Sequence, residues 1–144
     1  MIGNSTNKGR SNKKDFIMIG RVLKRKQQNA MSLRSINYAV GKTKMAAWFV
    51  SNCNTDSSRS RLTKTLQQYI SVDVYGKCGP FQCPRSRSAD CYTLLERDYK
   101  FYLSFENSLC KDYVTEKFFK ILLYNVVPVV YGKTNYSTVA PPHS

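Results

Sequence analysis

Residues 99–132 constrain the fold more than any other stretch, because they read as one complete supersecondary unit. Tyr99–Phe105 is an apolar, aromatic-rich run that predicts a buried strand. The polar stretch Glu106–Asp112 follows it, and Val114–Tyr124 then carries apolar residues at the spacing of one helix face. Val126–Tyr131 is a second apolar run. Strand, loop, helix and strand in this order predict a βαβ unit with two parallel strands.

A second unit of the same kind lies upstream. Met45–Ser51 predicts a strand, and Val72–Tyr75 predicts the strand that follows it. Ser57 or Ser58 is suited to cap a helix between them that extends to about Ile70.

The stretch between the two units is mostly irregular in its composition. Lys77–Asp90 is rich in Pro, Gly and Cys and predicts a loop, and Cys91–Arg97 predicts a short helix. We therefore expect an α/β fold over residues 45–144, with a Rossmann-like parallel sheet that is covered on both faces.

Polar side chains gather where a sheet of this kind binds ligands. In open α/β sheets the site lies beyond the carboxyl ends of the strands and beside helix N-termini, which attract phosphate. Glu116 and Lys117 stand in the first turn of the second predicted helix, where a lysine opposes the helix dipole unless an anion is bound. Arg59 and Arg61 stand near the start of the first helix, where an arginine can bind phosphate through two hydrogen bonds. The alternative for each, taken singly, is a solvated surface position.

Positive charge is concentrated near the N-terminus. Residues 1–44 hold 11 of the 23 Lys and Arg residues and one acidic residue, Asp15, and so carry +10 of the formal net charge of +14. We expect them to form a disordered, basic arm. The arm and the chain's 10 tyrosines leave a basic nucleic-acid-binding module as the competing function. Against it, the tyrosines fall largely in the apolar runs, where core packing is their expected role.

The 5 cysteines do not follow a metal-binding pattern. No C-x-x-C pair occurs, and the single histidine, His143, stands near the C-terminus. This argues against a zinc site and favours an oxidising compartment with one or two disulfides, although the sequence does not decide which cysteines pair. Asn4 and Asn135 stand in N-x-[ST] sequons.

Several stretches resemble one enzyme family in sequence, order and spacing. They read WFVSNCNTDSSRSRL, VDVYGKCGPFQCPRS, FYLSFENSLCKDYVTEKFF, VVPVVYG and NYSTVAPPHS. Over about Met45 to Ser144 the chain resembles the alpha-1,3-fucosyltransferases, and its cysteine pattern is most similar to the invertebrate and plant enzymes that fucosylate the N-glycan core. The resemblance implies transfer of L-fucose from GDP-fucose, in alpha-1,3 linkage, to a GlcNAc of a glycoprotein glycan.

The resemblance also implies an architecture and a location. Family members have two facing Rossmann-like domains of the GT-B type, and residues 45–144 resemble the C-terminal, donor-binding half without a closing helix after Gly132. They use no obligatory metal or other cofactor beside the donor substrate GDP-fucose. They are typically Golgi proteins held by one N-terminal membrane helix. This chain shows no apolar run of the roughly 20 residues that such a helix needs and no readable signal peptide, so we expect a fragment.

Individual residues acquire roles from the resemblance. Arg59 and Lys117 correspond to the arginine and lysine that contact the donor pyrophosphate. Glu116, Tyr113 and Asn107 match residues near the ribose and the fucose. The remaining donor-binding matches are Ser51 and Asn52, in the loop that lines the nucleotide cleft, and Glu106.

An inverting transfer also needs a carboxylate that takes the proton from the acceptor hydroxyl. In the family this base lies in a separate N-terminal domain that also binds the acceptor glycan, and residues 1–44 do not resemble that domain. We therefore expect no catalytic base in this chain, and a donor-binding half that does not catalyse efficient transfer alone. A further alternative is a catalytically inactive sugar-nucleotide-binding protein that has kept the donor-binding fold.

Overall fold

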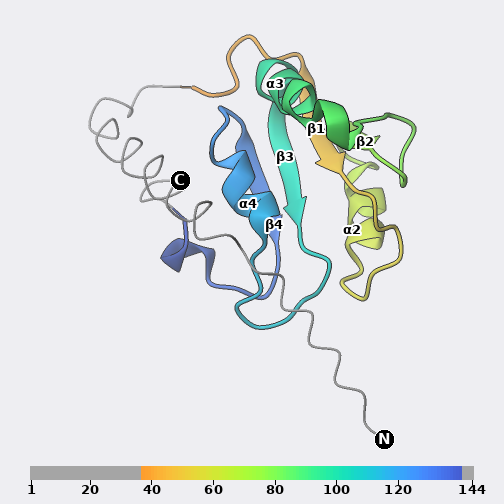
Figure 1. Cartoon of the computed structure of the whole chain (residues 1–144), viewed down its shortest axis with the longest axis vertical. Helices are drawn as coiled ribbons and strands as arrows, with labels where there is room; N and C mark the ends of the chain where they lie inside the picture. Colours follow the sequence, from red (N-terminus) through yellow and green to blue (C-terminus); the bar gives the residue numbers. More distant parts are fainter. Residues whose placement is uncertain (1–36, 141–144) are drawn as a thin grey trace, which may run out of the picture. The chain divides into compact units, whose positions relative to one another are not determined.

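Four parallel strands form a sheet in the order β2-β1-β3-β4 (Figure 1). The computed structural model describes residues 37–140, so most of the arm expected over residues 1–44 lies outside the described residues. The elements in chain order are β1 (Lys44–Phe49), α2 (Arg59–Leu66), β2 (Val72–Tyr75), η2 (Arg85–Arg87), α3 (Ser88–Asp98), β3 (Tyr99–Phe105), α4 (Glu116–Ile121), β4 (Val127–Tyr131) and η3 (Tyr136–Thr138). Both predicted βαβ units are confirmed, because β1 pairs with β2 and β3 pairs with β4 in parallel register.

The sheet is covered on both faces, as predicted. Successive side chains of a strand point to opposite faces, so each strand contributes to two apolar clusters. On one face, Leu62 and Leu66 of α2 pack against a cluster that includes Trp48, Val74 and Leu103. On the other face, α3 and α4 contribute to a second cluster; its members are Ala47, Tyr75, Tyr92, Leu95, Tyr99, Tyr102, Ile121 and Val126.

The helix between β1 and β2 is shorter than the sequence predicted. It ends at Leu66, because the amides of Gln68 and Tyr69 bond to carbonyls three residues back and tighten the following turn. Ser58 occupies the N-cap position, but its φ is 55° and its side chain makes no capping hydrogen bond. Ser58 thus stands at a predicted cap position, but it does not cap the helix through its side chain.

The helix between β3 and β4 is also shorter, and it covers Glu116–Ile121 instead of Val114–Tyr124. Thr115 has extended backbone and caps the helix, since its side chain accepts a hydrogen bond from the Lys117 amide. After Ile121 the chain again turns tightly, through a bond from the Tyr124 amide to the Ile121 carbonyl.

The segment before β3 is more helical than predicted. The sequence predicted a loop up to Asp90, whereas η2 and α3 follow each other without a gap. Arg87 and Asp90 pair at 3.1 Å across the first turn of α3, an i,i+3 contact of the kind that supports helices. None of the helices within residues 37–140 has the length and apolar character needed to cross a lipid bilayer.

Two disulfides confirm the prediction of one or two bridges. Cys53–Cys78 ties the loop after β1 to the loop after β2, and Cys83–Cys91 ties that second loop to α3. Cys110 is free and exposed. The first bridge thus holds together two of the loops that leave the carboxyl ends of the strands.

Candidate functional site

The sheet changes its direction of winding between β1 and β3. From β1 the chain passes through α2 to β2 on one side, and α3 then brings it back to β3 on the other side of β1. The loops after β1 and β3 consequently lead to helices on opposite faces of the sheet. At such a switch point, beyond the carboxyl ends of the strands, open α/β sheets bind their ligands. The loops that begin at Ser51 and Glu106 are therefore the candidate site.

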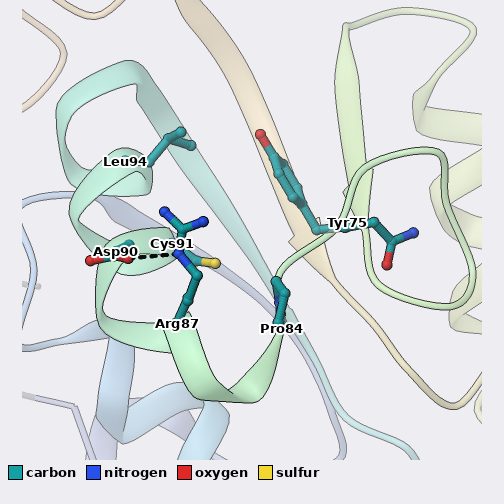
Figure 2. Close-up of a pocket in the computed structure, with 7 residues that line it drawn as sticks. Tyr75, Pro84, Arg87, Asp90, Cys91 and Leu94 are labelled. Carbon is teal, nitrogen blue, oxygen red and sulfur yellow. Dashed lines mark hydrogen bonds and ion pairs between the residues drawn. The ribbon is translucent and has the colours of Figure 1, made fainter.

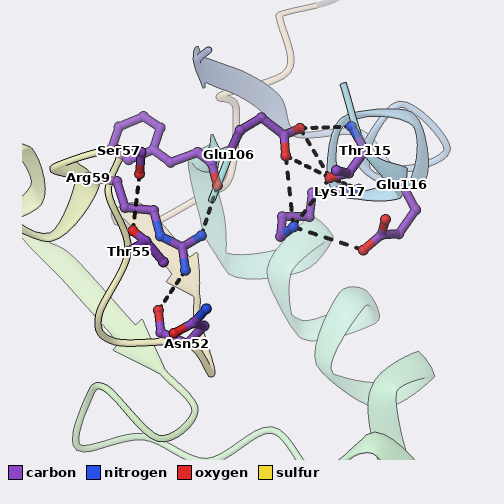
Figure 3. A network of polar contacts seen from close by, with 9 residues as sticks. Asn52, Thr55, Ser57, Arg59, Glu106, Thr115, Glu116 and Lys117 are labelled. Atoms are coloured by element: carbon purple, nitrogen blue, oxygen red, sulfur yellow. Dashed lines mark hydrogen bonds and ion pairs between the residues drawn. The ribbon is translucent and has the colours of Figure 1, made fainter. Parts of the chain in front are cut away.

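Arg59 spans this switch point inside the protein (Figure 3). Its Nη2 donates to the carbonyl oxygen of Asn52 at 2.6 Å, and its Nη1 donates to that of Phe105 at 3.1 Å. Only 1% of Arg59 is exposed, so a surface position is wrong for this residue, whereas Arg61 is exposed. Arg59 thus connects the loop after β1 to the end of β3.

The Arg59 guanidinium is held in a poorly solvated position. It lies over the Trp48 ring, with its Cζ 5.4 Å from the ring centroid, and its Nε has no protein partner. Burial lowers the pKa of Arg59, and the negative charge of Glu106 acts in the opposite direction. Because both terminal nitrogens bond to backbone carbonyls, a contact between Arg59 and a donor stays a prediction.

Glu106 is a carboxylate with no exposed surface. One of its oxygens accepts hydrogen bonds from the Thr115 amide at 2.9 Å and from the Thr115 hydroxyl at 3.1 Å, and the other lies 2.8 Å from the same hydroxyl. Its own amide donates to the Tyr131 carbonyl at 3.1 Å. Glu106 therefore links the ends of β3 and β4 to the first turn of α4.

Lys117 lies between two carboxylates, as Figure 3 shows. Its Nζ is 3.8 Å from Glu106 Oε2, 4.0 Å from Glu116 Oε1 and 3.2 Å from the Thr115 hydroxyl. The Lys117 side chain is 24% exposed and that of Glu116 is 80% exposed. Glu116 is thus a solvated surface residue, as the alternative from the sequence had it. Lys117 is instead a partly buried cation beside the buried carboxylate of Glu106.

The other three predicted residues border this network, and their side chains are not bonded to it. Ser51 is exposed at the end of β1, and Asn107 is partly buried, with an Oδ1 that has no protein partner. Tyr113 is 37% exposed, and its partial desolvation together with the nearby charges of Glu106 and Glu116 raises the pKa of its hydroxyl. The structure therefore joins Arg59 to Asn52 in one set of polar contacts and Glu106, Glu116 and Lys117 in another, and it leaves the other three residues at the border. The two sets meet where Arg59 bonds to the carbonyl of Phe105, the residue before Glu106.

Sequence reasoning missed Thr115 as a member of the site. A threonine followed by an acidic residue, shortly before apolar residues with helical spacing, is an N-cap signal, and that signal was available. Its bond to Glu106 was not, because the two residues are joined by a loop whose path the sequence does not show. Thr55 and Ser57, whose hydroxyl oxygens lie 3.1 Å apart beside Arg59, were missed for the same reason.

A separate hollow of about 200 Å³ lies between the end of β2 and the start of α3 (Figure 2). Its lining residues are Tyr75, Gln82, Pro84, Arg87, Asp90, Cys91 and Leu94. None of the predicted donor-binding residues lines it. Within residues 37–140, no three His, Cys, Asp or Glu side chains are grouped so that they could hold a metal ion.

Comparison with known proteins identifies the family. The family model described as "Glycosyltransferase family 10 (fucosyltransferase) C-term" matches residues 39–144. The chain belongs to glycosyltransferase family 10. Within this family it is similar to glycoprotein 3-alpha-L-fucosyltransferase A of Drosophila melanogaster, with 52% identity over 114 residues that cover 77% of the chain and 23% of that relative.

Two further members of family 10 are similarly close. Alpha-(1,3)-fucosyltransferase C of Drosophila melanogaster is 55% identical over 104 residues, covering 72% of this chain and 24% of its own length. Alpha-(1,3)-fucosyltransferase fut-1 of Caenorhabditis elegans is 47% identical over 109 residues, covering 75% of the chain and 25% of its own length. The chain thus spans about a quarter of the length of these relatives, and the nucleic-acid-binding alternative is not favoured.

Proposed function

We propose that this chain provides the donor-binding half of an alpha-1,3-fucosyltransferase. The proposed reaction is transfer of L-fucose from GDP-fucose to a GlcNAc of a glycoprotein glycan. The names of the relatives support the transfer of fucose in alpha-1,3 linkage, and one of them names a glycoprotein. The observation that carries the proposal is the placement of Arg59 and Lys117 on either side of Glu106, at the switch point of the sheet. Two cations at this place suit a nucleoside diphosphate.

The two cations have a chemical task in such a transfer. When the bond from fucose to the diphosphate breaks, negative charge builds up on the departing GDP. Positive groups held close to that oxygen stabilise the transition state more than the ground state. In the proposal Lys117 and Arg59 perform this task, and Arg59 exchanges its bond to the Asn52 carbonyl for one to the donor.

The remaining roles follow the family pattern. Glu116, Tyr113 and Asn107 border the ribose and fucose, and Ser51 and Asn52 line the nucleotide. We assign no catalytic base to this chain and place the base, with the acceptor-binding surface, in a second domain. The proposal also places the protein in the Golgi lumen or membrane, and its two disulfides fit an oxidising compartment.

The test is a calorimetric titration of the purified chain with GDP, and with ADP as the control nucleotide, at physiological salt. We expect selective binding of GDP. Arg59→Ala and Lys117→Ala should each weaken it about ten- to a hundredfold, the cost of one charge-assisted hydrogen bond. Lys64→Ala serves as the matched control, because Lys64 is an exposed cation in the last turn of α2.

The outcomes separate a charge effect from a formed site. If Lys64→Ala weakens GDP binding as much as Lys117→Ala, general attraction between the basic chain and an anion explains the affinity. If a folded chain binds GDP and ADP equally, the proposed donor site is not present and the proposal fails.

A further inference from the structure

Glu106 has a different place in the site from the one that the family resemblance implies. Its carboxylate is fully buried, and both oxygens already lie within hydrogen-bond distance of Thr115. A ligand would have to displace these bonds to reach it. The geometry therefore opposes a direct contact between Glu106 and a bound nucleotide.

We propose that Glu106 and Thr115 form a positioning pair that fixes Lys117 for the diphosphate of the donor, and that neither residue contacts the donor itself. This inference rests on the proposed function, because it takes Lys117 as the phosphate-binding cation. It assigns Thr115 to the site and changes the role of Glu106 from ligand to support.

The Thr115 hydroxyl donates to Glu106 and accepts from Lys117, so it links the two residues. An ionised carboxylate only accepts, so the single hydroxyl proton of Thr115 points to Glu106. The lone pairs of the same oxygen are then free for Lys117, whose amide lies at 3.4 Å and whose Nζ lies at 3.2 Å. One hydroxyl thus orients both the backbone and the ammonium group of Lys117.

The charge of Glu106 also holds Lys117 in place. Glu106 is a buried anion with Lys117 at 3.8 Å and the Arg59 guanidinium bonded to the carbonyl of the preceding residue, Phe105. A buried carboxylate without a nearby cation is strongly unfavourable, so this pairing keeps Lys117 folded back toward the sheet. In that position the Lys117 side chain stays 24% exposed, and its Nζ lies 4.0 Å from the carboxylate of Glu116.

Thr115 offers a matched pair of substitutions that isolates the hydroxyl. Thr115→Val keeps the shape and removes the bonds of the hydroxyl, while the bond from the backbone amide to Glu106 remains. Thr115→Ser keeps the hydroxyl. Glu106→Gln is the second probe, because it keeps one acceptor oxygen and removes the charge. Each variant is made in the full chain and also combined with Lys117→Met, and urea unfolding checks that it folds.

Binding is measured with GDP by calorimetry and with guanosine by its displacement of fluorescent GDP. We expect Thr115→Val and Glu106→Gln to weaken GDP about tenfold, Thr115→Ser to remain close to the original chain, and guanosine to be unaffected. In the Lys117→Met background the same changes should add less than about twofold, because residues that act through one another are not additive.

Two results would overturn the inference. Equal weakening of guanosine and GDP would indicate a direct nucleoside contact or general damage, and full additivity with Lys117→Met would show that the pair does not act through Lys117. If Glu106→Gln fails to fold, the Thr115 pair decides alone. A folded original chain without GDP selectivity would instead refute the proposed function, and the premise of this inference with it.

Discussion

Gly76 shows how closely a single residue is constrained beside the site. Its φ is +100°, a backbone conformation that favours glycine, and a Cβ at this position would overlap the carbonyl oxygen of Val50. Gly41 also has a positive φ, of +77°, but a Cβ there would meet nothing within 4 Å. Replacing each glycine by alanine therefore distinguishes two contributions to stability: the strain of a positive φ, present at both positions, and the overlap of the Cβ with backbone, present only at Gly76.

We predict that Gly76→Ala lowers the free energy of unfolding by about 3 kcal/mol or more, because it combines a strained φ with an overlap against backbone. Gly41→Ala should cost about 1–2 kcal/mol, the price of the conformation alone. Urea unfolding followed by circular dichroism measures both. If both variants lost the same unfolding free energy, the loop after β1 would have to move away from the new Cβ without an energetic cost.

At the same scale, Arg59 shows what a sequence can reveal about a site. Its position at the start of a helix after a buried strand marked it as a candidate. Its burial was not predictable, because its partners are the carbonyls of Asn52 and Phe105, and the second of these lies far along the chain. Residue type and local position made Arg59 a candidate for the site, while tertiary contacts determine which way its side chain points.

At the scale of elements, strands were predicted better than helices. β2 and β3 have the predicted bounds, because apolar runs buried on two faces leave a clear pattern. The helix ends depend on capping and on single tight-turn hydrogen bonds, which the apolar pattern does not contain. The 3-10 turn η2 and the first three residues of α3 were missed, because the Pro- and Cys-containing segment before them reads as a loop.

The two disulfides should stabilise the fold to different extents, because they close loops of different length. Cys53–Cys78 spans 25 residues and Cys83–Cys91 spans 8. Replacing both cysteines of the longer bridge by serine should cost about 3.5 kcal/mol of unfolding free energy, and of the shorter one about 2.5 kcal/mol, from the chain entropy that each bridge removes. Chemical unfolding of the two double variants measures the difference.

Cys110→Ser is the control for these variants, since this cysteine is free and exposed. It should leave the unfolding midpoint unchanged. A loss of stability in this variant, or a greater loss for the shorter bridge, would contradict the entropic account.

At the scale of the molecule, a buried group of tyrosines sets the response to alkaline pH. Burial is the main cause that raises the pKa of Tyr92, Tyr99 and Tyr102, and the hydroxyl of Tyr99 also donates to Asp73 at 2.6 Å. A folded pKa above the unfolded value means that the folded state keeps protons that the unfolded state releases. Their contribution is complete below the unfolded pKa of about 10 and is lost as the pH rises above it.

We therefore predict cooperative unfolding above about pH 10, with the tyrosinate absorbance rising in step with the loss of ellipticity. Tyr69→Phe is the control, because Tyr69 is exposed and its replacement should leave the alkaline unfolding transition unchanged. If the buried tyrosines ionised gradually while the ellipticity stayed constant, the core would be more open to solvent than the structure shows.

The strand order has a consequence for how quickly the chain folds. β1 is synthesised before β2 and β3, yet it lies between these two strands and pairs with both. Its contact with β3 joins residues 55 positions apart, as between Lys44 and Tyr99, and such distant pairings slow folding because a long loop must close first. During synthesis β1, α2 and β2 are complete before β3 emerges. Until then, one edge of β1 has no strand to pair with, and apolar side chains of β2 stay exposed to solvent. At this stage the nascent chain is prone to aggregate and suited to bind chaperones, and the rate at which β3 docks sets how long this stage lasts.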